Sequence, residues 1–292
     1  MGITAFCVAC ISEGIELRNA GISGEILILG YTHPSQFAAL VQYQLTQTVV
    51  DYPYAQAMQQ SGFRLHVHVA VDTGMHRLGI RCEDYQSLVN VFRMSNLIID
   101  GIFTHLAACD CMDEESRRFT GEQLTAFFQT VSALRADGYD CRGVHALSSY
   151  GILHYPDAAA DYVRPGIALY GVPSDCKENF PRLLPVLSLK ARVATVRTLY
   201  AGEAAGYGMD FIAPDDRRIA VLSIGYADGL PRMLSDGIGH VLLNGCIAPI
   251  LGRICMDQTL IDVSGIPSAA PGDVAVIIGK SGDCEITAPQ LA

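Results

Sequence analysis

The first part of the chain alternates short apolar runs with segments in which apolar residues recur at helical spacing. Short apolar runs of this kind are typical of strands. The predicted strands are Ala5–Ala9, Ile26–Leu29, Thr46–Val50, Leu65–Val71, Leu97–Thr104, Gly143–Ala146 and Val163–Tyr170. The helices between them are predicted to begin near Ser12, Pro34, Tyr54, Glu83, Thr120 and Ser149. Repeated alternation of strand and helix favours a parallel sheet.

The clearest predicted helix runs from Thr120 to Asp137. Thr120 and Gln123 have the spacing of a capping box at its start. Gly138 is suited to end it, because glycine adopts the left-handed conformation that often follows a helix. The apolar residues that recur along its face are Leu124, Phe127, Phe128, Val131 and Leu134.

The number of predicted strands is one short of the eight that close a (β/α)₈ barrel. Met1 stands only a few residues before the first of them. We therefore expect an α/β fold over residues 1–180, an incomplete (β/α)₈ barrel that lacks its first strand and helix.

The pattern changes after Gly171, where a proline-rich crossing from Pro173 to Pro185 is followed by alternating β runs without helical periodicity. Gly and Asn-Gly or Asp-Gly turns separate these runs. Residues 181–292 are therefore predicted to form a mainly β domain. Its clearest strands are Ala191–Val196, Ile219–Ile224, His240–Leu243 and Val274–Ile278.

Polar groups follow four of the predicted barrel strands. Arg77 follows the fourth strand, His105 the fifth and Ser149 the sixth, while the seventh carries Arg164 and Gly166. The chemistry of such barrels gathers at the carboxyl ends of the strands, so these groups predict a functional cleft.

The run from Val163 to Gly171 suits cofactor binding. Arg164 stays charged at any working pH, and the backbone N–H groups of Gly166 and Ile167 can meet a phosphate without an obstructing side chain. For this run alone, the simpler alternative is an ordinary buried strand with a surface arginine.

Composition narrows the classes of partner. The chain has 292 residues, and 20 basic against 30 acidic side chains give a net charge of −10, which disfavours nucleic acid and anionic membranes. No apolar run reaches the roughly 18 residues of a spanning helix and no signal peptide is recognisable, so we expect a cytoplasmic protein. The 10 cysteines are expected to be reduced thiols. The lone C-x-x-C at Cys7 and Cys10 predicts no metal site.

Three stretches of the β domain are unusual for plain strands: Gly206–Asp210, Gly225–Gly229 and Gly252–Gln258. Two of them place a tyrosine, Tyr207 or Tyr226, beside glycines. This arrangement gives an exposed hydroxyl and a close backbone approach, as a binding site needs, although a tyrosine in a tight turn is the commoner explanation for either one.

Taken together, these motifs resemble the alanine racemase family, pyridoxal 5'-phosphate enzymes built from a (β/α)₈ barrel followed by a β domain. The motifs that carry the resemblance occur in order over nearly the whole chain: DTGMHRLG at 72–79, THLA at 104–107, RPGIALYG at 164–171, GYGMDF at 206–211, GYADG at 225–229 and GRICMDQ at 252–258.

The resemblance implies a racemase in which two bases flank one carbon atom. Tyr207 matches the family's tyrosine base, and His105 matches the histidine that bonds it. Arg164 matches the arginine that bonds this histidine and the pyridine nitrogen of the cofactor. A phenol acts as a base near neutral pH only when positive charge lies close by, and the histidine and the arginine would meet that need.

The remaining matches concern binding. Arg77 would hold the cofactor's phenolic oxygen and orient the substrate carboxylate, Met256 would offer its N–H to that carboxylate, and Tyr226 would line the entrance. Family members are head-to-tail homodimers, so Tyr207, Tyr226 and Met256 would serve the partner's site. The groups implied to cradle the phosphate are Ser149 and the N–H groups of Gly166 and Ile167.

The sequence departs from the family in its lysines. The family's second base is a lysine on the first barrel strand that also carries the cofactor, but this chain has only Lys177, Lys190 and Lys280, all in or after the crossing. An N-terminally incomplete chain is therefore expected. Ile286–Ala292 resembles the start of a helix with no continuation, so the C-terminus is expected to be cut as well. Ala70 also stands where many members have a carbamylated lysine that fixes the arginine matching Arg77.

The leading interpretation is the interconversion of L-alanine and D-alanine, which supplies D-alanine for peptidoglycan. One alternative is the serine racemase module of a vancomycin-resistance-type protein, which is attached to a membrane domain. Another is a non-catalytic fragment or cofactor-binding pseudoenzyme, because the lysine is absent.

Overall fold

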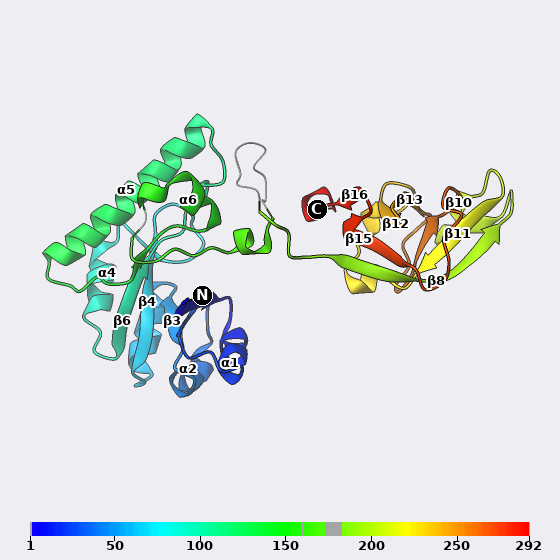
Figure 1. Cartoon of the computed structure of the whole chain (residues 1–292). Helices are drawn as coiled ribbons and strands as arrows, with labels where there is room; N and C mark the ends of the chain where they lie inside the picture. Colours follow the sequence, from blue (N-terminus) through cyan, green and yellow to red (C-terminus); the bar gives the residue numbers. More distant parts are fainter. Residues whose placement is uncertain (1, 159, 173–182, 292) are drawn as a thin grey trace. The chain divides into compact units, whose positions relative to one another are not determined.

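The computed structural model describes residues 2–158, 160–172 and 183–291. They form two compact units, the first running to Leu169 and the second beginning at Tyr170 (Figure 1). The predicted boundary between residues 180 and 181 lies outside the described residues.

The first unit is built on a parallel sheet with the strand order β1-β2-β3-β4-β6-β7. Three of these strands, β3, β4 and β6, are labelled in Figure 1. The six strands confirm six of the predicted ones, and a short β5 (Ile80–Arg81) that was not predicted pairs with β4. No ladder joins β1 to β7 within the described residues, so the sheet is an open part of a barrel, as predicted. The strands are β1 (Ala5–Val8), β2 (Glu25–Ile28), β3 (Thr46–Val49), β4 (Leu65–Asp72), β6 (Leu97–Phe103) and β7 (Val144–His145).

The predicted seventh strand, Val163–Tyr170, is wrong. Only Arg164 forms a bridge, with Ser148, and the chain then enters the 3-10 helix η3 (Ile167–Tyr170). Pro165 has no N–H group to donate to a ladder. The carbonyl of Gly166 accepts from the Leu169 N–H at 2.9 Å, which turns the chain instead of extending it.

The helices of the first unit begin near the predicted positions, with one exception. Helix α5 begins at Glu114, well before Thr120, because Asp113 is its N-cap and accepts from the Ser116 N–H at 3.0 Å. The predicted capping box at Thr120 and Gln123 is therefore wrong, and both residues are buried inside the helix. The helices are α1 (Ile11–Asn19), α2 (Phe37–Gln42), α3 (Tyr52–Gln60), α4 (Tyr85–Phe92), α5 (Glu114–Ala136) and α6 (Ser149–His154).

The second unit is a separate antiparallel sheet. Strand β12 pairs with both β13 and β15, so the order β12-β13-β14-β11-β8-β15 closes into a ring, and β16 lies outside it on β15. This confirms the predicted β domain. Its strands are β8 (Leu189–Leu199), β11 (Arg217–Leu222), β12 (His240–Leu243), β13 (Cys246–Leu251), β14 (Thr259–Asp262), β15 (Val274–Ser281) and β16 (Cys284–Ile286), with a small hairpin of β9 (Ala204–Ala205) and β10 (Phe211–Ile212).

Each unit has its own apolar core. In the first unit the core includes Phe127 and Leu134 of α5 together with Ile102 of β6, all of them fully buried. In the second unit the core fills the inside of the closed sheet, with Val241 and Ile261 fully buried. Neither core holds a disulfide, because every described cysteine is a single thiol. Across the ranges given above, no helix is both long and apolar enough to cross a membrane.

Phe127 provides a test of how the first core depends on α5. Phe127→Ala is expected to lower the free energy of unfolding by about 3–5 kcal/mol, because a fully buried ring leaves a cavity. Gln129→Ala, on the exposed face of the same helix, is the control and should change it by less than about 0.5 kcal/mol. Urea unfolding of both variants makes the comparison, and equal losses would contradict this account of the core.

Candidate active site

Arg164 is the most tightly held charge at the carboxyl ends of the strands. Its Nη2 donates to the carbonyl oxygens of Thr104 at 2.8 Å and Ala146 at 3.1 Å, and its Nη1 donates to His145 Nδ1. The guanidinium also lies over the Phe103 ring, 5.1 Å from the ring centre. Burial lowers the pKa of Arg164 to about 10, so the side chain is still positively charged at neutral pH.

His105 lies beside this arginine. Its Nδ1 is 3.5 Å from Arg164 Nη2. Burial, followed by the positive charges of Arg164 and Arg77, lowers the pKa of His105 to about 4. The imidazole is therefore neutral at pH 7 and can accept a hydrogen bond at one nitrogen while it donates from the other.

Gln123 fixes the segment that carries His105. Its Oε1 accepts from the Ala107 N–H at 3.0 Å, and its Nε2 donates to the His105 carbonyl and to Thr73 Oγ1, each at 3.3 Å. One buried amide thus connects the loop after β6 to the loop after β4. The sequence interpretation assigned Gln123 to a helix cap and missed this role.

The loop after β4 places Arg77. Asp72 accepts from the N–H groups of Gly74 and His76, each at 3.0 Å, which folds the loop back on itself. Gly79 closes it at φ +117°, where a Cβ would lie 2.7 Å from the Asp72 nitrogen. Arg77 is exposed and lines a cavity of about 80 Å³. His105 and the predicted Ala70 line the same cavity.

Ser149 and Gly166 form a second polar cluster at the same end of the sheet. Ser149 Oγ accepts from the N–H groups of Gly166 at 2.9 Å and Ala168 at 3.2 Å. A Cβ on Gly166 would meet only Ser149 Oγ, at 4.0 Å, so packing within the protein does not require glycine there. Ile167 begins η3 beside them and is exposed.

Tyr207, Tyr226 and Met256 all lie in the second unit, on loops that contact one another. The N–H of Tyr226 donates to Cys255 O at 3.0 Å, and the N–H of Ala227 donates to Met256 O at 2.9 Å. A Cβ on Gly225 would lie 2.3 Å from Met256 O, so this contact requires glycine.

The loop that carries Tyr207 joins the same group through Arg253. Asp210 pairs with Arg253, and a Cβ on Gly208 would lie 3.2 Å from the Arg253 Cζ. Tyr207 itself is 70% exposed in the 3-10 helix η4 (Tyr207–Met209). Both glycines that flank it have positive φ, which allows the tight turn expected from the sequence.

The structure therefore groups the predicted site residues within each unit. Arg77, His105 and Arg164 share the carboxyl end of the parallel sheet with the Ser149–Gly166 cluster. The sequence interpretation missed His145, whose only signal is a histidine inside an apolar strand. Among the described residues, no group of three or more His, Cys, Asp or Glu side chains is arranged so that it could hold a metal ion.

A partial parallel barrel with a polar cluster at the carboxyl ends of its strands, joined to a separate antiparallel β unit, is the architecture of a barrel enzyme with an added domain. Residues 1–174 match the family model "Alanine racemase, N-terminal domain", and residues 186–292 match "Alanine racemase, C-terminal domain". The chain belongs to the alanine racemase family.

Curated relatives and solved structures agree with this assignment. An amino-acid racemase of Enterococcus faecalis is 41% identical over 100% of the chain, and a serine/alanine racemase of Enterococcus gallinarum is 41% identical over 91%. The chain spans 41% and 38% of the lengths of these two relatives. The alanine racemase structure of Clostridium difficile 630 superposes with a TM-score of 0.91 at 30% identity, covering 99% of this chain and 76% of that one.

The titration of His105 tests the electrostatics of the site. We expect its midpoint near pH 4, because burial and two arginines disfavour the imidazolium. The unfolded chain titrates near the ordinary value of about 6.5, so this residue makes the fold less stable as the pH falls from about 6.5 towards 4. Arg77→Gln should raise the midpoint, whereas Arg81→Gln, outside the cavity, should leave it in place. Imidazole NMR signals report the midpoint, and an ordinary value in the unmodified chain would contradict the assignment.

Proposed function

We propose that this chain supplies the pyridoxal 5'-phosphate site and one proton-transfer group of an amino-acid racemase that acts on alanine. The observation that carries the proposal is Arg164, a buried arginine held beside His105 and next to the Ser149–Gly166 cluster. A ring nitrogen and a phosphate group of one cofactor would meet these two features. When bound, this cofactor supplies an electron sink for a carbanion at the substrate's α-carbon.

The donors present fit both ends of the cofactor. The contacts of Arg164 with the described residues use Nη1 and Nη2, which leaves the Nε–H group for a ring nitrogen. Ser149 Oγ accepts two backbone N–H groups, so its own hydroxyl hydrogen is available to a phosphate oxygen. The open space in front of Gly166, together with the N–H of Ile167, suits a phosphate.

The proton transfers require groups from both units. Tyr207 would take or return the α-proton on one face of the substrate. Neutral His105, whose Nδ1 faces the donor Arg164, would donate from Nε2 to the tyrosine oxygen. The charge of Arg164, which stays protonated, would favour the phenolate. Arg77 and the Met256 N–H would hold the substrate carboxylate, and Tyr226 would line the entrance.

A head-to-tail homodimer would bring these groups to one site. Large apolar side chains around the three connected loops of the second unit are exposed, and a second subunit could cover them. Tyr207, Tyr226 and Met256 would then complete the barrel site of the partner. These exposed side chains include Tyr207, Met209, Ile212, Tyr226, Met233 and Met256.

The opposite face requires a second base, which in the family is a lysine. Lys190 lies in β8 and Lys280 in β15, where Lys280 is 3.6 Å from Glu285, and Lys177 lies outside the described residues. Neither described lysine belongs to the barrel unit. The same observation favours a second candidate function, a cofactor-binding protein without racemase activity.

Alanine is the proposed substrate because the site offers no evident partner for an additional hydroxyl group. Arg77, His105 and Arg164 are assigned to the carboxylate, the tyrosine and the cofactor. An apolar pocket rejects an added hydroxyl by only about a hundredfold, whereas a site built to bond it can prefer serine. The proposed D-alanine product would serve peptidoglycan synthesis in the cytoplasm.

Cofactor binding by the chain tests the phosphate site. Ser149→Ala should raise the Kd for pyridoxal 5'-phosphate about tenfold, because one charged hydrogen bond is lost. Ser148→Ala is the matched control; its hydroxyl lies 4.0 Å from Cys109 Sγ and caps nothing, so binding should persist. Fluorescence titration measures both, and equal binding by the two variants would place the phosphate elsewhere.

Substrate preference tests the reaction. With the chain extended by a first barrel strand that carries a lysine, we expect a higher kcat/KM for alanine than for serine, measured by circular dichroism. The unextended chain should be inactive, and borohydride should fix no cofactor to it. A higher kcat/KM for serine would support the serine racemase alternative. No activity towards either amino acid, with cofactor bound, would favour the protein without racemase activity.

A further inference from the structure

Arg164, His145, His68 and Glu25 form a row of side chains in contact, which begins at the candidate site and is called the row below. His145 Nε2 lies 2.9 Å from His68 Nδ1, and His68 Nε2 lies 2.9 Å from Glu25 Oε1. His68 and His145 are almost fully buried. His68 Nε2 and Glu25 Oε1 are both buried, and within the described part of the chain this 2.9 Å ion-pair distance is the only polar contact that the structure shows for either of them. All four side chains, including Arg164, line a single cavity of about 340 Å³.

The donor at one end of this row and the carboxylate at the other fix which nitrogen of each imidazole carries the proton. Arginine can only donate, so His145 Nδ1 must accept, and its proton must be on Nε2. That proton is donated to His68 Nδ1, which places the proton of His68 on Nε2, facing the carboxylate of Glu25. Both imidazoles are therefore neutral, since a second proton on either one would meet another donor. Burial and the charge of Arg164 also hold the pKa of His145 far below its ordinary value.

The backbone makes room for the row. Gly101 of β6 lies against His68, and a Cβ there would be 2.4 Å from the His68 ring. Phe103, two residues further along the same strand, stacks on His145 with ring centres 4.8 Å apart. One strand thus provides a gap for one imidazole and a flat apolar surface for the other.

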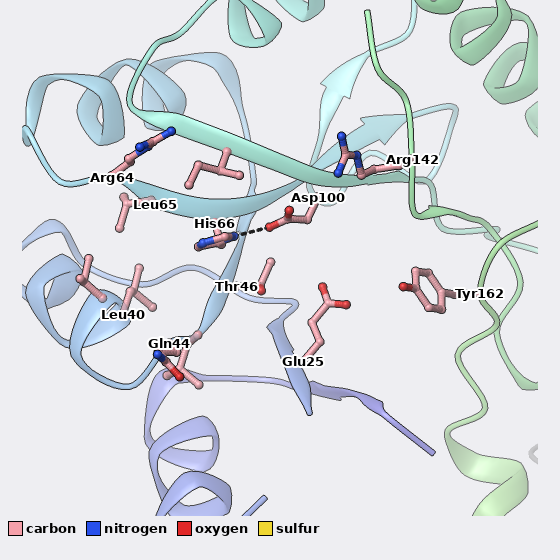
Figure 2. Close-up of a pocket in the computed structure, with 13 residues that line it drawn as sticks. Glu25, Leu40, Gln44, Thr46, Arg64, Leu65, His66, Asp100, Arg142 and Tyr162 are labelled. Atoms are coloured by element: carbon pink, nitrogen blue, oxygen red, sulfur yellow. Dashed lines mark hydrogen bonds and ion pairs between the residues drawn. The ribbon is translucent and has the colours of Figure 1, made fainter. Parts of the chain in front are cut away.

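The far end of the row reaches solvent at the amino ends of the strands. The Glu25 side chain is 27% exposed and points into a cavity of about 580 Å³, which Thr46 and His66 also line (Figure 2). The hydrogen bond from His68 holds the pKa of Glu25 below its ordinary value, so Glu25 is negatively charged at neutral pH. A negative charge at this end therefore faces a buried positive charge at the other, with two neutral rings between them.

We propose that Glu25 and His68 are positioning residues that act through His145 to hold the guanidinium of Arg164 in its charged, fixed orientation. Glu25 supplies a counter-charge for Arg164. His68 accepts from His145 and directs its own N–H at Glu25, so it keeps His145 in the tautomer that accepts from Arg164. The effect on cofactor binding rests on the proposed function, whereas the protonation of the row does not.

Asp100 is a matched control for Glu25, because it lines the same cavity of about 580 Å³. Asp100 is 2.6 Å from His66 Nδ1, and its side chain is 28% exposed, close to the value for Glu25 (Figure 2). His66 is 54% exposed and lies outside the row. Asp100→Asn therefore removes the same charge from the same cavity without touching the row that ends at Arg164.

The first measurement needs no cofactor. In the ¹⁵N-labelled full chain, His68 and His145 are both expected as neutral rings protonated at Nε2 at neutral pH. The Arg164 Nε–H signal should shift in Glu25→Gln, which removes the charge, and in Gly101→Ala, which displaces the His68 ring. It should not move in Asp100→Asn. A His68 protonated at Nδ1, or an Arg164 signal equally affected by all three variants, would overturn the proposal.

The second measurement uses pyridoxal 5'-phosphate as the probe. Glu25→Gln is expected to raise its Kd about tenfold, with Asp100→Asn unchanged. Circular dichroism of each variant confirms that the fold is retained. If the unmodified chain fails to bind the probe, the proposed function fails and the Arg164 signal alone decides the role of the row. Normal binding by Glu25→Gln, with normal binding by the unmodified chain, would overturn the proposal.

Discussion

A positive charge buried at the end of a parallel sheet is the constraint on which this site depends. A charged group removed from water is costly unless every donor finds an acceptor. Two backbone carbonyls, from Thr104 and Ala146, and the ring of His145 accept from the Nη1 and Nη2 donors of Arg164 and so meet most of this requirement. These acceptors stand at the ends of two adjacent strands, so the orientation of the arginine depends on the pairing of β6 with β7.

The state of the neighbouring imidazoles depends on burial and on this charge. Burial disfavours a proton on the rings of His105 and His145, and the charge of Arg164 acts in the same direction. Neutral imidazoles can accept as well as donate, which a row of hydrogen bonds requires. The negative charge of Glu25 then lies at the opposite end of the strands, where solvent is available, and not beside the candidate chemistry.

The second unit is organised differently, through backbone contacts that leave the side chains of Tyr207, Tyr226 and Met256 exposed. Gly225 permits the loop of Tyr226 to pair with the loop of Met256, and the ion pair of Arg253 with Asp210 adds the loop of Tyr207. The closed sheet beneath them holds the loop ends in place. These fixed loops therefore present exposed tyrosines and methionines on one connected surface.

The pattern of neighbouring residues in the sequence was sufficient to predict most secondary-structure elements and to identify the motifs. Periodicity placed six strands of the parallel sheet and the change to β structure, because side-chain alternation and helical spacing are properties of neighbouring residues. The prediction of a strand at Val163–Tyr170 was wrong. Its apolar residues are typical of a strand, but Pro165 has no N–H group to donate to a neighbouring strand. The predicted start of α5 was also wrong, because the N-cap at Asp113 was not recognised from the sequence.

The tertiary structure decided which side chains that are distant in the sequence contact each other. His68 and His145 are 77 residues apart, and nothing near either one in the sequence indicates the other. Their contact follows from strand order and register, which bring β4, β6 and β7 together and turn both rings to the same side. Gln123 likewise reaches two loops only because α5 packs where it does. The sequence by itself determined the secondary-structure elements and the reactive residue types. Strand register and helix packing decided which of these residues contact one another, because the side-chain hydrogen bonds of the site join residues that are far apart in the sequence.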